Sequence, residues 1–352
     1  MKKIILLPMA IMAAFTLSCT REDPVRTSAE PQTGELLIHV FPDGISTKAG
    51  TPDISSQSHE TRVRKVDIYV FDENGLLNLH HWNDDSSLED IRLSVSTGTK
   101  EVWAVLNGPT LGGIVRVSDL KEAVVSMEDN QATASGGTFT MAGSNTCTVT
   151  ASGTTPCSIT ADRFVARVRL TKVKVNLPTA YGSVDFPSVM LTNVVADRKI
   201  GEDAGTGRWI NKKGRTDQGR IIDGSASAKA SAEAVTFLKW NRHVNNGTQL
   251  DLSDQFLCFY GFENPATEDK TGTDGSFLEE PTRLVLTAII SGGTYYYPVT
   301  LPNLQRNRAY EVELTITGLG SDDPDIVPKR GSVNADITIL PWKEGIIVNE
   351  TI

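Results

Sequence analysis

The 352-residue chain contains 39% hydrophobic and 22% charged residues, which is ordinary for globular protein and sufficient for two domains of about 150 residues each. Its formal net charge is −9, and loss of an N-terminal segment containing Lys2 and Lys3 would take that charge to −11. Nucleic acid binding requires basic surface, so this acidic balance argues against a nucleic acid partner.

The N-terminus has the pattern of a secretory signal. Two lysines precede a short apolar run, too short to span a membrane, that ends beside Cys19. We therefore predict a signal peptide over residues 1–18 and lipidation of Cys19 by acyl chains such as palmitate. Thr16 stands where lipoprotein signals usually carry Leu, so the alternative is cleavage by ordinary signal peptidase near Ala13 or Ala14.

An isolated strand follows the signal. Residues 20–33 are polar and contain proline, which indicates a flexible tether. Residues 35–41 are then predicted to form a strand, in which the side chains of Leu36, Ile38 and Val40 point to one face. No partner strand lies nearby in the sequence, so we expect this strand to pair with a distant part of the chain.

Alternating apolar residues predict further strands at residues 63–71, 88–95 and 101–106. Asn74-Gly75 is a strong hairpin signal. A helix is predicted next, with Asp119 as its cap and with one apolar face formed by Leu120, Val124 and Met127.

Two cysteines flank a segment that contains glycine and proline. If short strands surround this turn, Cys147 and Cys157 come close enough to form a disulfide, which an exported protein permits. The alternative is two unpaired thiols in a loop. Cys258 lies in an apolar run and is predicted to be a buried free thiol.

The second half repeats the alternating pattern in short segments separated by glycine and proline. The predicted strands are 164–175, 189–195, 256–262, 284–290, 295–299, 310–316, 334–342 and 345–352. Residues 226–234 are rich in alanine and fit either helix or loop. Many short strands predict an all-β protein built from antiparallel sandwiches.

Six motifs occur in a fixed order along most of the chain. They are R-K-V-D-I-Y-V-F-D-E-N-G at 64–75, V-W-A-V-L-N at 102–107, T-M-A-G at 140–143, R-F-V-A-R-V at 163–168, N-L-Q-R-N-R-A-Y at 303–310, and a final strand at 335–342 that ends in tryptophan. Together they resemble the motifs of the fimbrillins of the Bacteroidetes, which are subunits of the type V pilus.

The resemblance implies two transthyretin-like antiparallel β-sandwich domains with few short helices, at residues 49–162 and 163–352. It implies a lipidated propeptide at 19–48 that includes the first strand. It also implies export as a lipoprotein to the outer membrane, proteolytic removal of that strand, and refilling of the vacated groove by a neighbour's C-terminal strands, here residues 334–352.

The donor residues and the cleavage site follow from this resemblance. Ile346, Val348 and Ile352 share one parity, so they can occupy the pockets of the removed strand by β-augmentation. The family's protease favours arginine, but the loop before the body offers Lys48-Ala49, so we expect cleavage after Lys48. Glu22-Asp23 fits either the acidic signal for outer-leaflet export or an ordinary solvated pair.

Metal and catalytic sites are not predicted. His80 and His81, near Asp84 and Asp85, would point to opposite faces of a strand and cannot easily share a metal. Residues 269–275 lack the alternating carboxylates of a calcium loop. The sequence contains none of the common hydrolase, zinc-protease or nucleotide-binding motifs, so we expect no enzyme activity, no metal and no cofactor.

We therefore expect a structural pilin of a cell-surface fimbria that supports adhesion. Its expected partners are other fimbrial subunits, a processing protease and, before maturation, the outer membrane through the lipid. Two alternatives stay open. One is a monomeric surface lipoprotein that binds glycan through aromatic residues such as Trp82 or the tyrosines at 295–297. The other is a pilus anchor that keeps its first strand and lipid.

Overall fold

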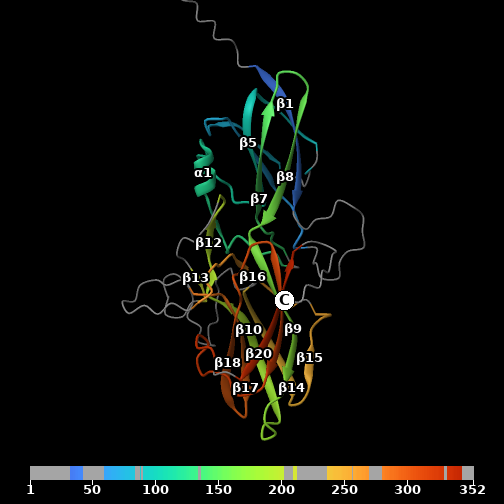
Figure 1. Ribbon diagram of the computed structural model, residues 1–352, viewed down its shortest axis with the longest axis vertical. Coiled ribbons are helices and arrows are strands. Elements are labelled where there is room, and N and C mark those ends of the chain that lie inside the picture. The colour runs from blue at the N-terminus through green and yellow to red at the C-terminus, as the bar shows by residue number, and fades with distance from the viewer. Residues whose placement is uncertain are drawn as a thin grey trace, which may run out of the picture.

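The computed structural model describes residues 32–42, 59–83, 88, 90–133, 136–201, 209–211, 236–255, 257–268, 280–328 and 331–342. The described chain is elongated, with two groups of strands stacked along its long axis (Figure 1). β1, β5, β7 and β8 lie toward one end, and β9, β10, β14, β17 and β18 toward the other. The all-β prediction is confirmed. No described helix is both long and apolar enough to cross a membrane.

The first group of strands forms one sheet in the order β3-β2-β5-β7-β8-β1-β4. Its strands are β1 (Thr33–Pro42), β2 (Val66–Phe71), β3 (Leu77–Asn83), β4 (Ile91–Ser96), β5 (Gly98–Leu106), β7 (Met141–Val149) and β8 (Thr154–Arg163). Alternate side chains of these strands meet in a common apolar core, to which β1 contributes three residues. β1 is thus a member of the sheet, between β8 and β4, and its apolar face is buried in this core.

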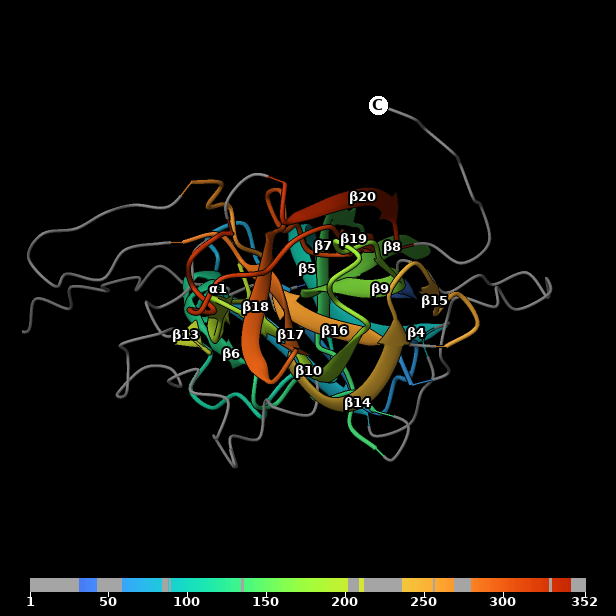
Figure 2. The same ribbon diagram turned by 90° about the horizontal axis from the view of Figure 1, so that it is seen from below.

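The second group forms two layers, which are seen along the long axis in Figure 2. One sheet runs β14-β10-β17-β18 and the other β15-β9-β19-β20, with β16 also paired to β9. The strands are β9 (Val165–Val175), β10 (Ser183–Thr192), β14 (Phe237–Asn245), β15 (Gln249–Asp251), β16 (Cys258–Phe262), β17 (Arg283–Ile290), β18 (Gly293–Thr300), β19 (Arg308–Ile316) and β20 (Val333–Pro341). The strands predicted at 164–175, 256–262, 284–290, 295–299, 310–316 and 334–342 correspond to β9, β16, β17, β18, β19 and β20. The strand predicted at 189–195 is instead divided between the end of β10 and β11, and β14 and β15 were not predicted. The segment 345–352 lies outside the described residues.

Two short ladders lie outside the main sheets, and one of them connects the two groups of strands. β6 (Val124–Ser126) pairs with β12 (Asp197–Lys199), and β11 (Val194–Val195) pairs with β13 (Trp209–Ile210). Because β6 precedes β7 and β12 follows β10, the first of these ladders ties the two halves of the chain together.

The hairpin between β2 and β3 forms at the predicted Asn-Gly turn. The Asp72 carboxylate Oδ1 accepts hydrogen bonds from the backbone N–H groups of Asn74 and Leu76, both at 2.9 Å. Gly75 has a φ of 71°, a conformation that glycine adopts without steric cost. Local side-chain and backbone chemistry thus sets this turn.

The predicted helix is shorter than expected and differently capped. α1 spans Val117–Glu122, and Asp119 lies within its first turn rather than before it. Its carboxylate Oδ2 accepts the N–H groups of Val115 and Arg116 at 3.0 and 2.7 Å. Val124 begins β6 and is 45% exposed, so the predicted apolar helix face is wrong beyond Leu120. Cross-strand pairing with β12 replaces the helix at that point.

The pairing is mainly antiparallel, but the sequence pattern does not predict its two parallel pairs. β1 runs parallel to β8, and β9 runs parallel to β19. Alternation of side chains is the same in both kinds of pair, and therefore periodicity cannot distinguish them. The predicted domain boundary at 162/163 stays a prediction; β8 ends at Arg163 and β9 begins at Val165.

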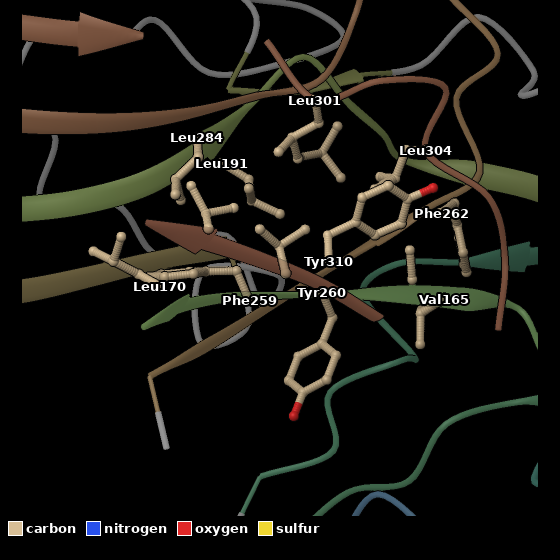
Figure 3. Close-up of a cluster of buried hydrophobic side chains, with 14 of the residues drawn as sticks. Val165, Leu170, Leu191, Phe259, Tyr260, Phe262, Leu284, Leu301, Leu304 and Tyr310 are labelled. Atoms are coloured by element: carbon tan, nitrogen blue, oxygen red, sulfur yellow. The ribbon is translucent and has the colours of Figure 1, made fainter. Parts of the chain in front are cut away.

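The core of the second group surrounds the motif at 303–310 (Figure 3). Leu191, Leu284 and Leu301 gather on one side of Tyr310. The Tyr310 hydroxyl accepts a hydrogen bond from the Gln305 N–H and donates one to the Asn303 carbonyl, both at 2.8 Å. The tyrosine therefore fastens the loop before β19 to its own strand.

Candidate functional site

The first strand occupies a groove between two neighbours. β1 pairs with β4 in antiparallel register from Thr33↔Ser96 to Ile38↔Ile91, and with β8 in parallel register from Glu35↔Thr154 to Pro42↔Ala161. Leu36, Ile38 and Val40 are each no more than 2% exposed. The three residues predicted to fill apolar pockets therefore do so in the complete chain.

The strands beside this groove have few other partners. Among the described strands, β4 forms a ladder with β1 alone, because it ends the sheet. β8 is paired to β7 only at Met141↔Arg163 and Ala142↔Asp162. Loss of β1 would therefore leave β4 without a ladder partner and most of β8 with an open edge.

The energetic scale of such a loss is large. Burial of one aliphatic side chain stabilises a protein by about 1.5–3 kcal/mol, so three amount to about 5–9 kcal/mol. A whole domain is stable by only about 5–15 kcal/mol. A body without β1 consequently favours any extended apolar segment that can fill the same groove.

Polar contacts fix the register of β1 on its outer face. Glu35 Oε1 accepts a hydrogen bond from Arg92 Nη1 at 2.7 Å, and its Oε2 accepts one from Thr154 Oγ1 at 3.0 Å. The hydrogen bond from Arg92 lowers the pKa of Glu35. A Cβ on Gly34 would lie 2.1 Å from the Thr150 carbonyl oxygen, so only glycine fits where β1 enters the sheet.

The structure brings Cys147 and Cys157 together. Their side chains are in hydrogen-bonding contact, Cys157 is 2% exposed, and Cys147 packs partly buried against the same core as β1. Both are thiols here, so the disulfide stays a prediction. Contact with the Cys157 thiol, followed by the charge of Lys100, lowers the pKa of Cys147, whereas contact with Cys147 and burial raise that of Cys157. Cys258 is a third thiol, and burial raises its pKa.

A buried charged cluster lies where the two groups of strands meet. Glu60 is fully buried, and its Oε2 lies 3.2 Å from Arg167 Nη1. Glu60 Oε1 accepts a 2.6 Å hydrogen bond from the Tyr260 hydroxyl, and the Glu60 carbonyl accepts one from Arg163 Nε at 3.1 Å. Figure 3 shows Tyr260 pointing away from the neighbouring apolar side chains. Glu60 thus contacts β8 through its backbone carbonyl, and β9 and β16 through its carboxylate.

Trp342, which follows β20, is buried at this junction between the two groups of strands. It is 3% exposed. The guanidinium carbons of Arg163 and Arg167 lie 4.7 and 5.3 Å from the centroid of its ring, and Tyr260 stacks on it with centroids 5.9 Å apart. Phe139 meets it edge-on at 6.1 Å. The end of the last described strand is therefore anchored between the two halves.

Two asparagines make hydrogen bonds in the same region. Asn107 Nδ2 donates to the carbonyls of Arg62 and Phe139 at 2.9 and 3.0 Å, and Asn307 Oδ1 accepts Arg163 Nη1 at 3.3 Å. Both asparagines have a positive φ, at 55°. The motifs at 102–107, 163–168 and 303–310 thus converge at the junction with Trp342. Sequence reasoning missed Glu60, which sits in a loop without periodicity.

The histidine pair is not arranged as a metal site. His80 Nε2 lies 3.0 Å from Asp67 Oδ1, and its ring stacks on Tyr69 at 4.2 Å. His80 and His81 alternate along β3, as predicted. Within the described part of the chain, no three metal-ligating side chains form a cluster.

The aromatic residues considered for glycan binding differ in burial: Tyr297 is buried, Tyr295 and Tyr296 are half-buried, and Trp82 is exposed. Tyr297 is fully buried and its hydroxyl donates to the Gly318 carbonyl at 2.7 Å. Tyr296 packs against Met190 and Val285. Trp82 differs from them, because it is 59% exposed on β3. Among these four residues, Trp82 is the one exposed ring, and a single ring does not form an extended surface on which sugars could stack.

Several predicted site residues lie outside the described part of the chain. They are Cys19 at the lipidation site, Lys48 and Ala49 at the cleavage site, and Ile346, Val348 and Ile352 in the donor segment. Asp84, Asp85 and residues 226–234 and 269–275 also lie outside it.

The family model of the major fimbrial subunit protein FimA matches residues 35–195 of the chain. This match begins in β1 and includes the β7–β8 pair and the start of the second group of strands.

The fold is similar to that of three solved proteins. A fimbrilin from Porphyromonas gingivalis W83 has a TM-score of 0.60 at 15% identity, over 90% of this chain and 98% of that chain. Candidate cell adhesion proteins from Bacteroides eggerthii and Parabacteroides distasonis have TM-scores of 0.60 and 0.61, each at 16% identity over 88% of this chain, covering 96% and 100% of theirs. The chain is thus similar to the FimA major fimbrial subunit family over residues 35–195, and it shares its fold with a solved fimbrilin.

Proposed function

We propose that this chain is a structural pilin that is exported as a lipoprotein acylated at Cys19 and polymerises by strand exchange. Cleavage after Lys48 releases β1, and the C-terminal segment of a second subunit enters the vacated groove. The observation that carries this proposal is the placement of β1. Three fully buried apolar residues on one terminal strand fill a core between β4 and β8, neither of which has another extensive ladder among the described strands.

The opposite end of the chain supports the role of donor. β20 is attached to its own sheet along one edge, by pairing with β19. Most of its side chains are exposed or half-buried, and Ile339 is 46% exposed. Beyond Trp342, the residues Ile346, Val348 and Ile352 share the parity that a groove-filling strand requires. The proposed donor is therefore this C-terminal segment.

The proposal places the mature protein in a surface fimbria, where it supports adhesion, with other fimbrial subunits and the processing protease as partners. A role in building a filament rather than in catalysis fits a family of fimbrial subunits. Before maturation the lipid would hold the chain at the outer membrane, and cleavage after Lys48 would separate the body from that lipid.

A pair of matched variants tests the processing step. The full precursor, its Lys48→Gln variant and its Arg62→Gln variant would each be treated with a protease specific for basic residues and sized by light scattering. Arg62 donates a hydrogen bond to the Gly137 carbonyl and belongs to the folded body. We expect cleavage after Lys48 and growth of polymers for the precursor and the Arg62 variant, and monomers for the Lys48 variant. Polymers from uncut precursor, or from the Lys48 variant, would contradict the proposal.

A further inference from the structure

The two neighbouring cysteines occupy facing positions on β7 and β8. The pairs Met141↔Arg163 and Ala142↔Asp162, continued in the same register, place Cys147 opposite Cys157. The hydrogen-bonded ladder stops after Ala142, but the strands stay adjacent, because Asn145 Nδ2 donates to the Ser158 carbonyl at 2.8 Å. The two thiols contact each other. Facing residues of antiparallel strands lie within the separation that a disulfide requires.

This thiol pair lies at the wall of the groove that holds β1. Cys157 is opposite Ile38 of β1, and both side chains belong to one core. Cys147 is opposite Lys100 of β5, the strand that neighbours β7 on the edge away from β8. A bond between the two sulfurs would therefore connect β8 to β7, whose own ladder with β5 extends from Gly98↔Val149 to Leu106↔Met141.

The surroundings favour Cys147 as the first thiol to react. Cys147 is partly exposed, whereas Cys157 is buried. The ammonium group of Lys100 is buried, donates a 2.8 Å hydrogen bond to Ser96 Oγ and favours the thiolate of Cys147. A thiolate, and not a thiol, attacks a disulfide. Both conditions for the first step, charge and access, are therefore met at Cys147.

We propose that Cys147 and Cys157 form a disulfide that staples β8 to β7 and holds the wall of the groove in place while β1 is absent. The Cys147 thiolate attacks one sulfur of an oxidised disulfide donor, whose S–S bond breaks and whose other half leaves as a thiolate. Cys157 then loses its proton to solvent and attacks the Cys147 sulfur, expelling the second donor thiolate. Two cysteines are oxidised, and one donor disulfide is reduced to two thiols.

The need for a staple rests on the proposed function, since β8 loses its β1 partner only if β1 leaves. Without β1, the described β8 keeps two ladder pairs, both at its C-terminal end. The staple lies near its other end, so the two attachments together would fix the strand in the position that an incoming segment must match.

Thiol accounting on the full chain tests whether the bond forms. Wild-type protein and its Cys258→Ala variant would be incubated with oxidised glutathione, alkylated in denaturant and digested. The expected result is one peptide pair joined through Cys147 and Cys157 in both proteins, with Cys258 alkylated in the wild type. Alkylation of Cys147 and Cys157 in both proteins would overturn the inference.

A second experiment tests the staple without any strand exchange. Leu36→Asp in the full chain places an unpaired charge in the core and undocks β1, at a position that faces Thr155 rather than the cysteines. We expect limited proteolysis within residues 143–161 to be about tenfold slower in the oxidised than in the reduced variant. Adding Cys147→Ala and Cys157→Ala should abolish the difference. Equal cleavage rates in oxidised and reduced Leu36→Asp protein would contradict the staple, whatever the fate of β1 in fibres.

Discussion

Glu60 and Arg167 form a buried ion pair, with 3.2 Å between Oε2 and Nη1, although 107 positions separate them in the sequence. Glu60 lies at the start of the body, shortly after the proposed cleavage site, and Arg167 lies at the start of β9. The pair therefore ties the beginning of the mature chain to its second group of strands. Removing one member of such a pair leaves a charge that is buried without its partner.

Glu60→Gln should destabilise the protein strongly. Loss of the carboxylate charge breaks the buried Glu60–Arg167 pair, and breaking such a pair costs about 3–5 kcal/mol. Urea unfolding of the full chain would measure this loss. Glu35→Gln is the matched control, because the Glu35–Arg92 pair is 42% and 55% exposed, and solvent-exposed pairs contribute little to stability. Equal losses in the two variants would refute the structural role of Glu60.

Trp342→Ala should also cost substantial stability. The buried ring contacts Arg163, Arg167 and Tyr260, and removal of a buried tryptophan costs about 3–5 kcal/mol. Trp82→Ala changes the same side chain at a site that is 59% exposed and should alter the free energy of unfolding by no more than about 0.5 kcal/mol. The same Trp82 variant should adhere to surfaces like the wild type; loss of adhesion would favour the glycan-binding alternative.

The pH dependence of stability should carry a contribution from His59. Burial lowers its pKa below the ordinary value of 6.5; Glu60 opposes this shift and Arg62 adds to it. Between the lowered value and 6.5 the unfolded chain binds more protons than the native one, so stability rises with pH across this window and falls on acidification. His59→Gln should flatten the dependence measured by urea unfolding between pH 5 and about pH 7.

His243 is a control, because its contribution to the pH dependence of stability has the opposite sign. A hydrogen bond from its ring to Asp185 raises its pKa, so its contribution is present below 6.5 and is lost as pH rises through the raised value. His243 and Asp185 are 58% and 59% exposed, so this contribution should be small. The assignment of the pH dependence of stability to His59 would be contradicted if His243→Gln flattened that dependence and His59→Gln left it unchanged.

The strands and their buried faces could be predicted because alternation is a local property. Leu36, Ile38 and Val40 alternate in the sequence and are buried together in the structure. The partner of β1 could not be predicted, because β8 lies more than 100 residues away and parallel pairing leaves no local signal. The helix prediction is wrong beyond Leu120 for a related reason. The short apolar spacing after Leu120 fits both a helix face and the strand that forms there.

The junction was only partly visible in the sequence. Arg163, Arg167 and Trp342 belong to motifs that the sequence shows, but their common location depends on how distant segments pack. Glu60 gave no signal, since a single acidic residue in a polar loop is normally solvated. The proximity of Cys147 and Cys157 could be predicted, because only ten positions and a turn separate them in the sequence.

Truncation after Trp342 should separate folding from assembly. The shortened chain keeps β20 and the buried tryptophan, so its unfolding midpoint should stay within about 2 °C of the full chain, as for surface changes of less than about 0.5 kcal/mol. It loses Ile346, Val348 and Ile352, and the cleaved subunit should therefore fail to elongate filaments. Electron microscopy would show this; normal filaments from truncated subunits would disprove the donor assignment.

Removal of β1 is the central step of the proposed assembly. Peptide mass spectrometry of subunits taken from native surface fibres would identify their first residue directly. We predict a mature N-terminus at Ala49, with no peptide from residues 33–42, and precursor from the membrane fraction that still contains those residues. Fibre subunits that retain Leu36, Ile38 and Val40 in their own chain would contradict the exchange of strands between neighbours.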